Sequence, residues 1–217
     1  MKGLDRMVND VELEVQLTSH LIGKNSLDPR VMVAIKSIPR HEFLPADFKY
    51  CAYENHPAPI GSGQTISQPY IVALMSDLLD TKPSDIILEI GTGSGYQAAI
   101  LSQLVKKVYS VEILEDLYKK ASKRLTKLGY ENIKIRNADG YFGWPEYAPY
   151  DGIIVTAAVE HIPPALIEQL QIGARLVIPI GLPYSYQELM LIKKVAFAKV
   201  ETQAILGVTF VPLTGKH

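Results

Sequence analysis

The stretch that decides the fold is Ile86-Ile87-Leu88-Glu89-Ile90-Gly91-Thr92-Gly93-Ser94-Gly95-Tyr96-Gln97. Its apolar start, residues 86–90, predicts a buried parallel strand, and the pattern after Gly95 predicts a helix. Glycines between a strand and a helix let the backbone turn tightly and let a ligand approach the main chain. The stretch therefore predicts a nucleotide-cofactor turn.

Two features of this turn disfavour a dinucleotide. The fingerprint G-x-G-x-x-G requires a glycine where Tyr96 stands, and the third glycine, Gly95, comes one position earlier. Glu89 would repel an anionic pyrophosphate but suits the sulfonium and ammonium groups of S-adenosylmethionine. Glu112 follows Gly91 by 21 positions, near the spacing of about 20 at which a carboxylate meets a ribose diol. We therefore expect S-adenosylmethionine as cofactor and S-adenosylhomocysteine as product. The alternative is that both acids merely end their strands.

Strand and helix patterns alternate from residue 85 onward. The expected strands are 85–90, 107–112, 132–136, 150–155 and 174–180, and the expected helices are 95–105, 114–128 and 163–171. Such alternation predicts an α/β fold with a doubly wound, Rossmann-like and mostly parallel sheet. Residues 187–195 and 204–211 are strand-like with no helix between them. They should form a terminal antiparallel pair.

The region before the sheet is predicted to be helical and then irregular. A first helical pattern can end at Gly23, and a second begins with Asp28 as N-cap and stops at Pro39. Residues 55–69 are rich in Pro, Gly and small polar side chains, which predicts a long and therefore functional loop. We expect one domain over residues 1–217, with an N-terminal helical extension (1–60) and a catalytic core (61–217).

Composition is that of an ordinary globular protein, with 47% hydrophobic and 21% charged residues and a net charge of −1. The charge does not favour a nucleic-acid partner. The basic cluster at 119–127 is expected to be a solvated helix face. One cysteine, Cys51, allows no internal disulfide, and no metal-ligand spacing is apparent. No leader or membrane-spanning run is visible in the sequence, so we expect a cytoplasmic protein without a membrane partner.

Further candidate residues lie where the later strands end. Asp139, beside Gly140, follows the third strand and can accept a hydrogen bond from an adenine amino group, or it can simply form a turn. Thr156 and Ala157 follow the fourth strand and are small enough to leave room for a ligand. His41 and His161 fall in no recognisable triad or metal spacing and are expected to be structural.

Four separated segments resemble the protein-L-isoaspartate (D-aspartate) O-methyltransferase family. They are Ile38-Pro39-Arg40-His41-Glu42-Phe43-Leu44, Ile60-Gly61-Ser62-Gly63-Gln64-Thr65-Ile66-Ser67-Gln68-Pro69-Tyr70, Leu88-Glu89-Ile90-Gly91-Thr92-Gly93-Ser94-Gly95-Tyr96-Gln97 and Phe210-Val211-Pro212-Leu213. The glycine run is shared with many methyltransferases, whereas the second segment points to this family. The chain departs from the family pattern at Val159 and Glu160, where relatives have prolines.

The resemblance implies methylation of the α-carboxylate of L-isoaspartyl residues, and possibly of D-aspartyl residues, in damaged proteins and peptides. The ester then cyclises to a succinimide that reopens in part to normal aspartate. The partners implied are isoaspartyl substrates, and the enzyme is expected to be a monomer. Ser67 is the implied catalytic residue. The expected cofactor-binding residues are Glu89, Gly91, Thr92, Gly93, Ser94, Gly95, Glu112, Asp139 and Gly140, and the expected substrate-binding residues are Gln64, Thr65, Ile66, Thr156 and Ala157.

The chemistry of the implied reaction agrees with the residues present. A carboxylate with a pKa near ~4 is ionised at neutral pH, so it needs no general base to accept a methyl group. The enzyme must supply alignment and exclusion of water. Three alternatives stay open: Ser67 only caps the helix after it; the chain methylates another carboxylate, an RNA or a small molecule; or it is a cofactor-binding regulatory module without turnover.

Overall fold

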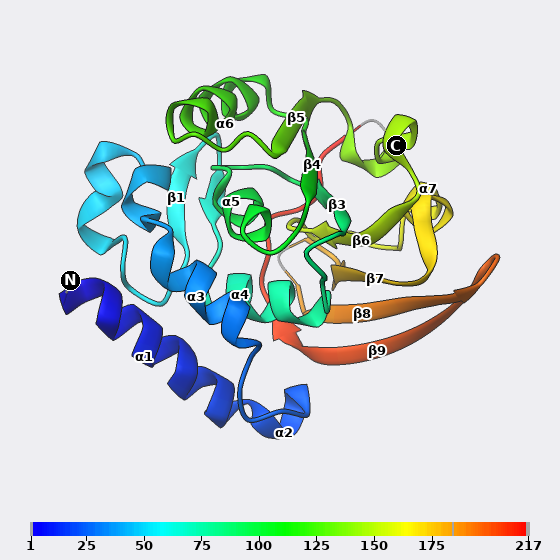
Figure 1. Cartoon of the computed structure of the whole chain (residues 1–217), viewed down its shortest axis with the longest axis horizontal. Helices are drawn as coiled ribbons and strands as arrows, with labels where there is room; N and C mark the ends of the chain where they lie inside the picture. Colours follow the sequence, from blue (N-terminus) through cyan, green and yellow to red (C-terminus); the bar gives the residue numbers. More distant parts are fainter. Residues whose placement is uncertain (1, 184, 216–217) are drawn as a thin grey trace.

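A seven-stranded sheet forms the centre of the molecule, which the computed structural model describes over residues 2–183 and 185–215 (Figure 1). Its strands are β3 (Ile86–Ile90), β4 (Lys107–Glu112), β5 (Ile133–Asn137), β6 (Tyr150–Val155), β7 (Leu170–Gly181), β8 (Gln187–Ala196) and β9 (Lys199–Val208). They lie in the order β5-β4-β3-β6-β7-β8-β9. Strands β3 to β7 are parallel, while β8 and β9 are antiparallel to their neighbours. The doubly wound sheet with a terminal antiparallel pair is thus confirmed.

Helices cover both faces of this sheet. They are α1 (Lys2–Leu17), α2 (Ser19–Ile22), α3 (Pro29–Ser37), α4 (Pro69–Leu78), α5 (Tyr96–Ser102), α6 (Glu115–Lys127) and α7 (Pro164–Gln169), with short 3-10 helices at Arg40–Phe43, Ala46–Cys51, Gly140–Phe142 and Pro145–Tyr147. Alternate side chains of β3 point to opposite faces. Ile87 packs into a core that includes α1 and α3 to α6, whereas Leu88 and Ile90 pack with Trp144 and α7.

The N-terminal helices pack against the helices that cover the sheet. Helix α1 packs on α3 and α4 through Met7 and Val11. Helix α2 ends at Gly23, which has a φ of +72°. The Asp28 side chain accepts a hydrogen bond of 2.8 Å from the Arg30 N–H and so caps α3, as predicted. Within residues 2–183 and 185–215, no helix combines the length and the apolar character that crossing a membrane requires.

Residues 55–69 differ from the expected irregular loop. They contain an antiparallel hairpin of β1 (Ala58–Gly61) and β2 (Gln64–Ile66). Gly61, Ser62 and Gly63 make its turn, all with positive φ. Ala58, Ile60 and Ile66 are buried, which anchors the hairpin in the core. The few apolar side chains of this segment lie among Pro, Gly and polar residues, so its sequence shows no strand pattern that would predict the two short strands.

Two boundaries near the C-terminal end also differ from expectation. Helix α7 ends at Gln169, and β7 begins at Leu170 rather than 174, because Leu170 pairs with Tyr150 ahead of a bulge. Strand β9 starts at Lys199 and ends at Val208 rather than running from 204 to 211. Its first half, residues 199–204, lies at the sheet edge and is mostly exposed. The sequence there has no apolar alternation that would reveal a strand.

Candidate active site

A cleft lies where the carboxyl ends of β3, β4 and β6 meet the β1–β2 hairpin. Carboxyl ends of parallel strands meet at one edge of such a sheet, which is why residues distant in sequence converge there. The predicted site residues that line the cleft are Gln64, Thr65, Gly91, Gly93, Glu112, Gly140, Thr156 and Ala157. The structure therefore brings predicted cofactor residues and predicted substrate residues to the same cleft.

Gly91 occupies a position that only glycine fits. Its φ is +94°, and a Cβ atom built on it would lie 2.5 Å from Thr156 Oγ1. The Thr156 hydroxyl donates a hydrogen bond of 2.6 Å to the Gly91 carbonyl oxygen. The Gly91 N–H donates to the Val111 carbonyl oxygen at 2.8 Å. The turn is thereby fixed between β4 on one side and Thr156, at the end of β6, on the other.

Glu112 is buried at the end of β4 and faces the turn. Its Oε2 accepts a hydrogen bond of 2.7 Å from the Gly93 N–H, and its Oε1 accepts one of 2.9 Å from the Leu114 N–H. Both carboxylate oxygens are therefore oriented by the backbone. Because Glu112 also lines the cleft, it is held where a ligand hydroxyl can reach it.

Glu89 lies elsewhere than the sequence argument placed it. It is fully buried beneath the turn and is not among the residues that line the cleft. The Ser110 hydroxyl donates to its Oε2, and the Thr92 hydroxyl contacts the Ser110 hydroxyl at 2.5 Å. Burial raises the pKa of Glu89 to about 8. At neutral pH this side chain is therefore mostly a neutral acid that supports the turn from below, and the geometry gives no support to its expected contact with the cofactor.

The remaining predicted cofactor residues flank the cleft in different ways. Gly95 begins α5 with a φ of +88°. The Ser94 carbonyl oxygen accepts a hydrogen bond of 2.8 Å from Arg124 Nη1. Asp139 accepts a hydrogen bond of 3.0 Å from the Tyr141 N–H, so it forms the turn that places Gly140 in the cleft.

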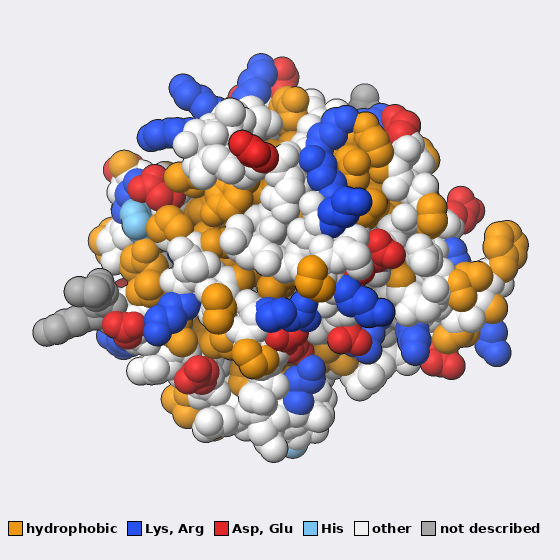
Figure 2. Space-filling view, in the orientation of Figure 1, with side chains coloured by type: hydrophobic (Ala, Val, Ile, Leu, Met, Phe, Trp, Pro, Cys, Tyr) orange, Lys and Arg blue, Asp and Glu red, His pale blue; other side chains and the backbone are white. Residues whose placement is uncertain are grey.

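Arg124 therefore departs from the expected solvated face of α6. Burial lowers its pKa, and its guanidinium ties α6 to the glycine turn. The lysines of the same helix are exposed, and Lys and Arg side chains project outward over α6 in Figure 2. The expectation of a solvated basic face holds for these lysines and fails for Arg124.

Ser67 lines a second cavity of about 640 Å³ that adjoins the cleft. The two share Thr65, Thr156 and Val211 in their linings. The N-cap of α4 is Gln68, so Ser67 does not serve as the helix cap. The side chain of Ile66 turns into the core and is buried, so a contact with substrate, which stays a prediction, would have to use its backbone.

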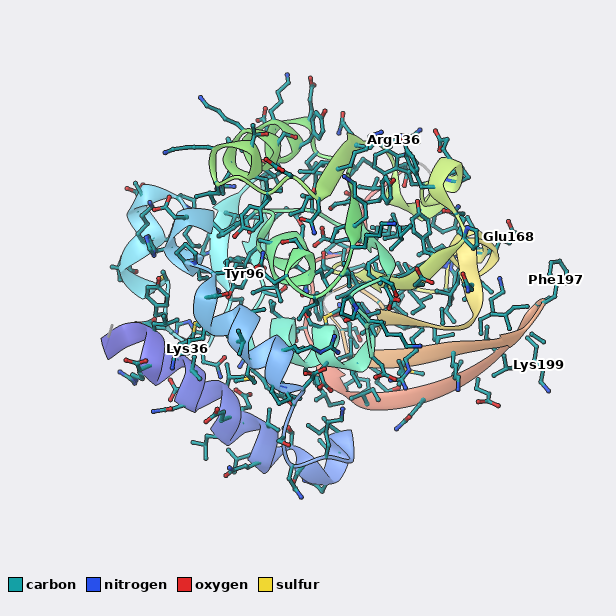
Figure 3. The ribbon with its side chains drawn as sticks, in the orientation of Figure 1. Lys36, Tyr96, Arg136, Glu168, Phe197 and Lys199 are labelled. Atoms are coloured by element: carbon teal, nitrogen blue, oxygen red, sulfur yellow. The ribbon has the colours of Figure 1, made fainter. Side chains whose placement is uncertain are left out.

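Arg40 is a residue of this site that the sequence argument did not single out. Its guanidinium is completely buried and donates to the carbonyl oxygens of Ala52 (2.7 Å), His56 (3.1 Å) and Ser67 (3.1 Å). It also lies over the ring of Tyr96, 5.8 Å from the centroid, and Figure 3 labels Tyr96 beneath the hairpin. Its acceptors are backbone atoms from distant segments, and no sequence spacing reveals them.

The C-terminal segment closes the cleft. Val211, Pro212 and Leu213 line it, and hydrogen bonds connect Ala158 to both Val211 and Leu213 (2.8 and 2.7 Å). The only sequence signal for this contact was the family resemblance of residues 210–213. No group of three or more His, Cys, Asp or Glu side chains suited to a metal occurs in the described part of the chain.

Comparison with known proteins identifies the family. The model of the protein-L-isoaspartate(D-aspartate) O-methyltransferase family matches residues 13–217. The chain belongs to this family. A protein-L-isoaspartate O-methyltransferase 2 of Nitrosococcus oceani is 57% identical over 217 residues, which cover 100% of this chain and 99% of the relative. A second such protein, from Syntrophobacter fumaroxidans, is 55% identical over 98% of this chain and 86% of the relative.

Solved structures of similar proteins agree with this family. A protein-L-isoaspartate O-methyltransferase with 29% identity has a TM-score of 0.80, over 96% of this chain and 66% of the other. A structure from Plasmodium falciparum in complex with S-adenosyl-L-homocysteine has a TM-score of 0.76 at 23% identity, over 94% and 97% of the two chains, and supports the fold. The expectations of an enzyme and of an S-adenosylmethionine-dependent methyltransferase are confirmed by the family.

Proposed function

We propose that this chain transfers a methyl group from S-adenosylmethionine to the α-carboxylate of L-isoaspartyl residues, and also of D-aspartyl residues, in damaged proteins and peptides. The observation that carries the proposal is the junction of the two cavities. The cleft beside Gly91 and Glu112 and the cavity beside Ser67 share Thr65, Thr156 and Val211. A methyl donor in the first and a carboxylate in the second meet at these residues.

The cleft residues fit S-adenosylmethionine. Gly91 and Gly93, which have no side chains, line the cleft, so a ligand can contact the main chain there directly. The Glu112 carboxylate would accept hydrogen bonds from the ribose hydroxyls, and the apolar side chains of Ile113, Leu114 and Leu117 would pack on the adenine. When bound, this cofactor supplies a methyl group on a positively charged sulfur. Glu89 supports the turn as a buried neutral acid rather than as a charge facing that sulfur.

The residues around Ser67 position the methyl acceptor. Of the residues that line the cavity, Glu14 carries the charge, and its carboxylate is held by Asn55 and Gln68 at 2.6 and 2.9 Å. The acceptor carboxylate would therefore be held by neutral donors, and we propose the Ser67 hydroxyl and backbone N–H groups of the hairpin for this role. No proton transfer is needed, because the carboxylate is ionised at neutral pH. The work left to the chain is orientation and exclusion of water.

The test uses a matched pair of peptides that differ only in one aspartyl or isoaspartyl linkage. Each is incubated with the enzyme and methyl-labelled S-adenosylmethionine. We expect base-labile label on the isoaspartyl peptide alone. Equal labelling of the aspartyl peptide, or label only on RNA or a small molecule, would assign the enzyme to another acceptor. Binding of the cofactor without any labelled product would indicate a regulatory module.

The organisation of the protein belongs to the same proposal. One domain, composed of the helical extension (1–60) and the catalytic core (61–217), acts as a monomer in the cytoplasm, without nucleic-acid or membrane partners. The near-neutral net charge of −1 supports the lack of a nucleic-acid partner. Packing of α1 on α3 and α4 supports one folding unit. Sedimentation at several protein concentrations tests the monomer.

A further inference from the structure

A second hollow extends the Ser67 cavity along helix α1. It has a volume of about 750 Å³ and lies between residues 6–18, which comprise most of α1 and the residue after it, and the segment 50–56. Glu14 and Thr18 line both this hollow and the Ser67 cavity. The two hollows therefore adjoin each other at these residues, and we call the one along α1 the α1 groove.

The junction between the α1 groove and the Ser67 cavity is built from fixed polar groups. Glu14 Oε2 accepts hydrogen bonds from Asn55 Nδ2 and from Gln68 Nε2, the neighbour of Ser67. The hydroxyls of Thr18 and Tyr70 lie 2.6 Å apart. These bonds tie α1 to the hairpin, so the groove has a defined position relative to Ser67.

Helix α1 has apolar side chains on two sides, and only one of these sides is buried in the core. Met7, Val11 and Val15 are buried against the neighbouring helices. Leu13 and Leu17 of α1 lie four residues apart and line the α1 groove, and Leu21 of α2 lines the adjoining Ser67 cavity; all three are exposed. Tyr50, across the groove, is 83% exposed. Contiguous exposed apolar side chains beside a polar junction are typical of a binding surface.

We infer that the α1 groove binds the stretch of substrate polypeptide that flanks the isoaspartyl residue. This inference rests on the proposed function, because a polypeptide whose modified residue sits beside Ser67 must leave the cavity through its openings. The occupant is an extended chain with apolar side chains, of the kind that an unfolded or damaged protein exposes. Arg6 to Leu17 spans about 16 Å of helix, which matches about five extended residues.

The test compares peptides of different reach. The short isoaspartyl peptide has two residues on each side of the linkage. Two long peptides add six residues with leucines on the amino side or on the carboxyl side. We expect one of the long peptides to have a kcat/KM about tenfold higher than the short one, because burial of partly exposed leucines is worth ~1–2 kcal/mol in total. The double substitution Leu13→Ser and Leu17→Ser should bring this ratio to about one.

Matched controls separate the groove from general effects of surface leucines. Leu17 and Val33 are both 66% exposed, and Phe197, at the far tip of the β8–β9 hairpin in Figure 3, is 88% exposed. Val33 and Phe197 lie away from the α1 groove. The variants Val33→Ser and Phe197→Ser should keep the long-to-short ratio of the unmodified enzyme.

Each outcome decides the inference. Equal kcat/KM for all peptides, or a length advantage that survives the double substitution, would overturn it while leaving the proposed function intact. Failure to methylate even the short isoaspartyl peptide would remove the proposed function and the inference together. A double variant that changes only the sedimentation of the protein, from dimer to monomer, would assign the groove to a second copy of this chain.

Discussion

The buried guanidinium of Arg40 donates a hydrogen bond of 3.1 Å to the backbone carbonyl of Ser67. The same guanidinium donates hydrogen bonds to the carbonyl oxygens of Ala52 and His56. Arg40 therefore connects both ends of the β1–β2 hairpin to the end of the 3-10 helix that precedes the hairpin. Burial of a cation is costly; the three hydrogen bonds offset part of this cost, although Arg40 Nε has no partner among the described residues. Arg40 thus fixes the position of the backbone from which the Ser67 side chain extends.

Substitution Arg40→Met should therefore lower kcat/KM for isoaspartyl peptide by about tenfold or more, since a small displacement of the acceptor site is costly for transfer. The affinity for S-adenosylhomocysteine, measured by calorimetry, should stay the same. Arg40→Lys keeps the charge but loses the fork of donors, and should recover only part of the activity.

Lys194 offers a matched control for Arg40. It is also buried and also donates to three carbonyl oxygens, those of Ile167, Glu168 and Leu170, at the end of α7. Lys194→Met should lower the melting temperature as Arg40→Met does, yet keep the kinetics of the unmodified enzyme. Equal kinetic losses in the two variants would show that Arg40 acts only through stability.

Substitution Ser67→Ala should reduce methyl transfer by about 10- to 100-fold, the effect of one hydrogen bond of ~1.5–3 kcal/mol to a charged group. Cofactor affinity should not change, because Ser67 lines the acceptor cavity and not the cleft. Steady-state kinetics with isoaspartyl peptide and calorimetry with S-adenosylhomocysteine separate the two effects. Ser84→Ala, at an exposed serine outside both cavities, is the control; turnover of Ser67→Ala at the control rate would refute the role.

Substitution Glu112→Gln should weaken cofactor binding by about 10- to 100-fold, because an amide nitrogen cannot accept a hydrogen bond from a ribose hydroxyl. Calorimetry with S-adenosylmethionine measures the effect. The control is Glu115→Gln, three residues later on the exposed start of α6. Unchanged affinity in Glu112→Gln would remove this residue from the cofactor site.

The pKa of Glu89 makes stability depend on pH. The raised value of about 8 in the folded state means that folding favours the protonated acid. Between the unfolded pKa of about 4.5 and the folded pKa, the folded state binds more protons, so this residue lowers the free energy of unfolding by about 1.4 kcal/mol per pH unit as the pH rises. Glu89→Gln should remove this slope. Denaturant unfolding at pH 5, 6, 7 and 8 should show the variant gaining stability relative to the unmodified chain; a constant difference would contradict the assignment.

The geometry of the cleft beside Gly91 and Glu112 was largely predictable from sequence, because it depends on local rules. Glycines must stand where φ is positive, as at Gly91 and Gly95, and the carboxyl ends of parallel strands must converge, which brings Glu112 and Thr156 to one cleft. Runs of apolar residues were sufficient to predict the central parallel strands β3 and β6, whose side chains are largely buried on both faces.

The missed features depend on contacts between distant residues. Nothing local indicates that Arg40 binds carbonyl groups 12 to 27 positions away. Glu89 was expected to carry a charge, but its burial under α5 is a result of packing. The predicted bounds of β9 were wrong because the exposed first half of this strand is held by hydrogen bonds to β8 rather than by apolar side chains.

The shared wall of Thr65, Thr156 and Val211 has a kinetic consequence. If the donor binds beside Glu112 and the acceptor beside Ser67, as proposed, the two ligands occupy compartments whose linings differ except at these shared residues. We then expect the methylated chain to leave without prior exchange of S-adenosylhomocysteine, and the two products to dissociate in either order. Product-inhibition kinetics should then show the pattern of random product release rather than that of a compulsory order.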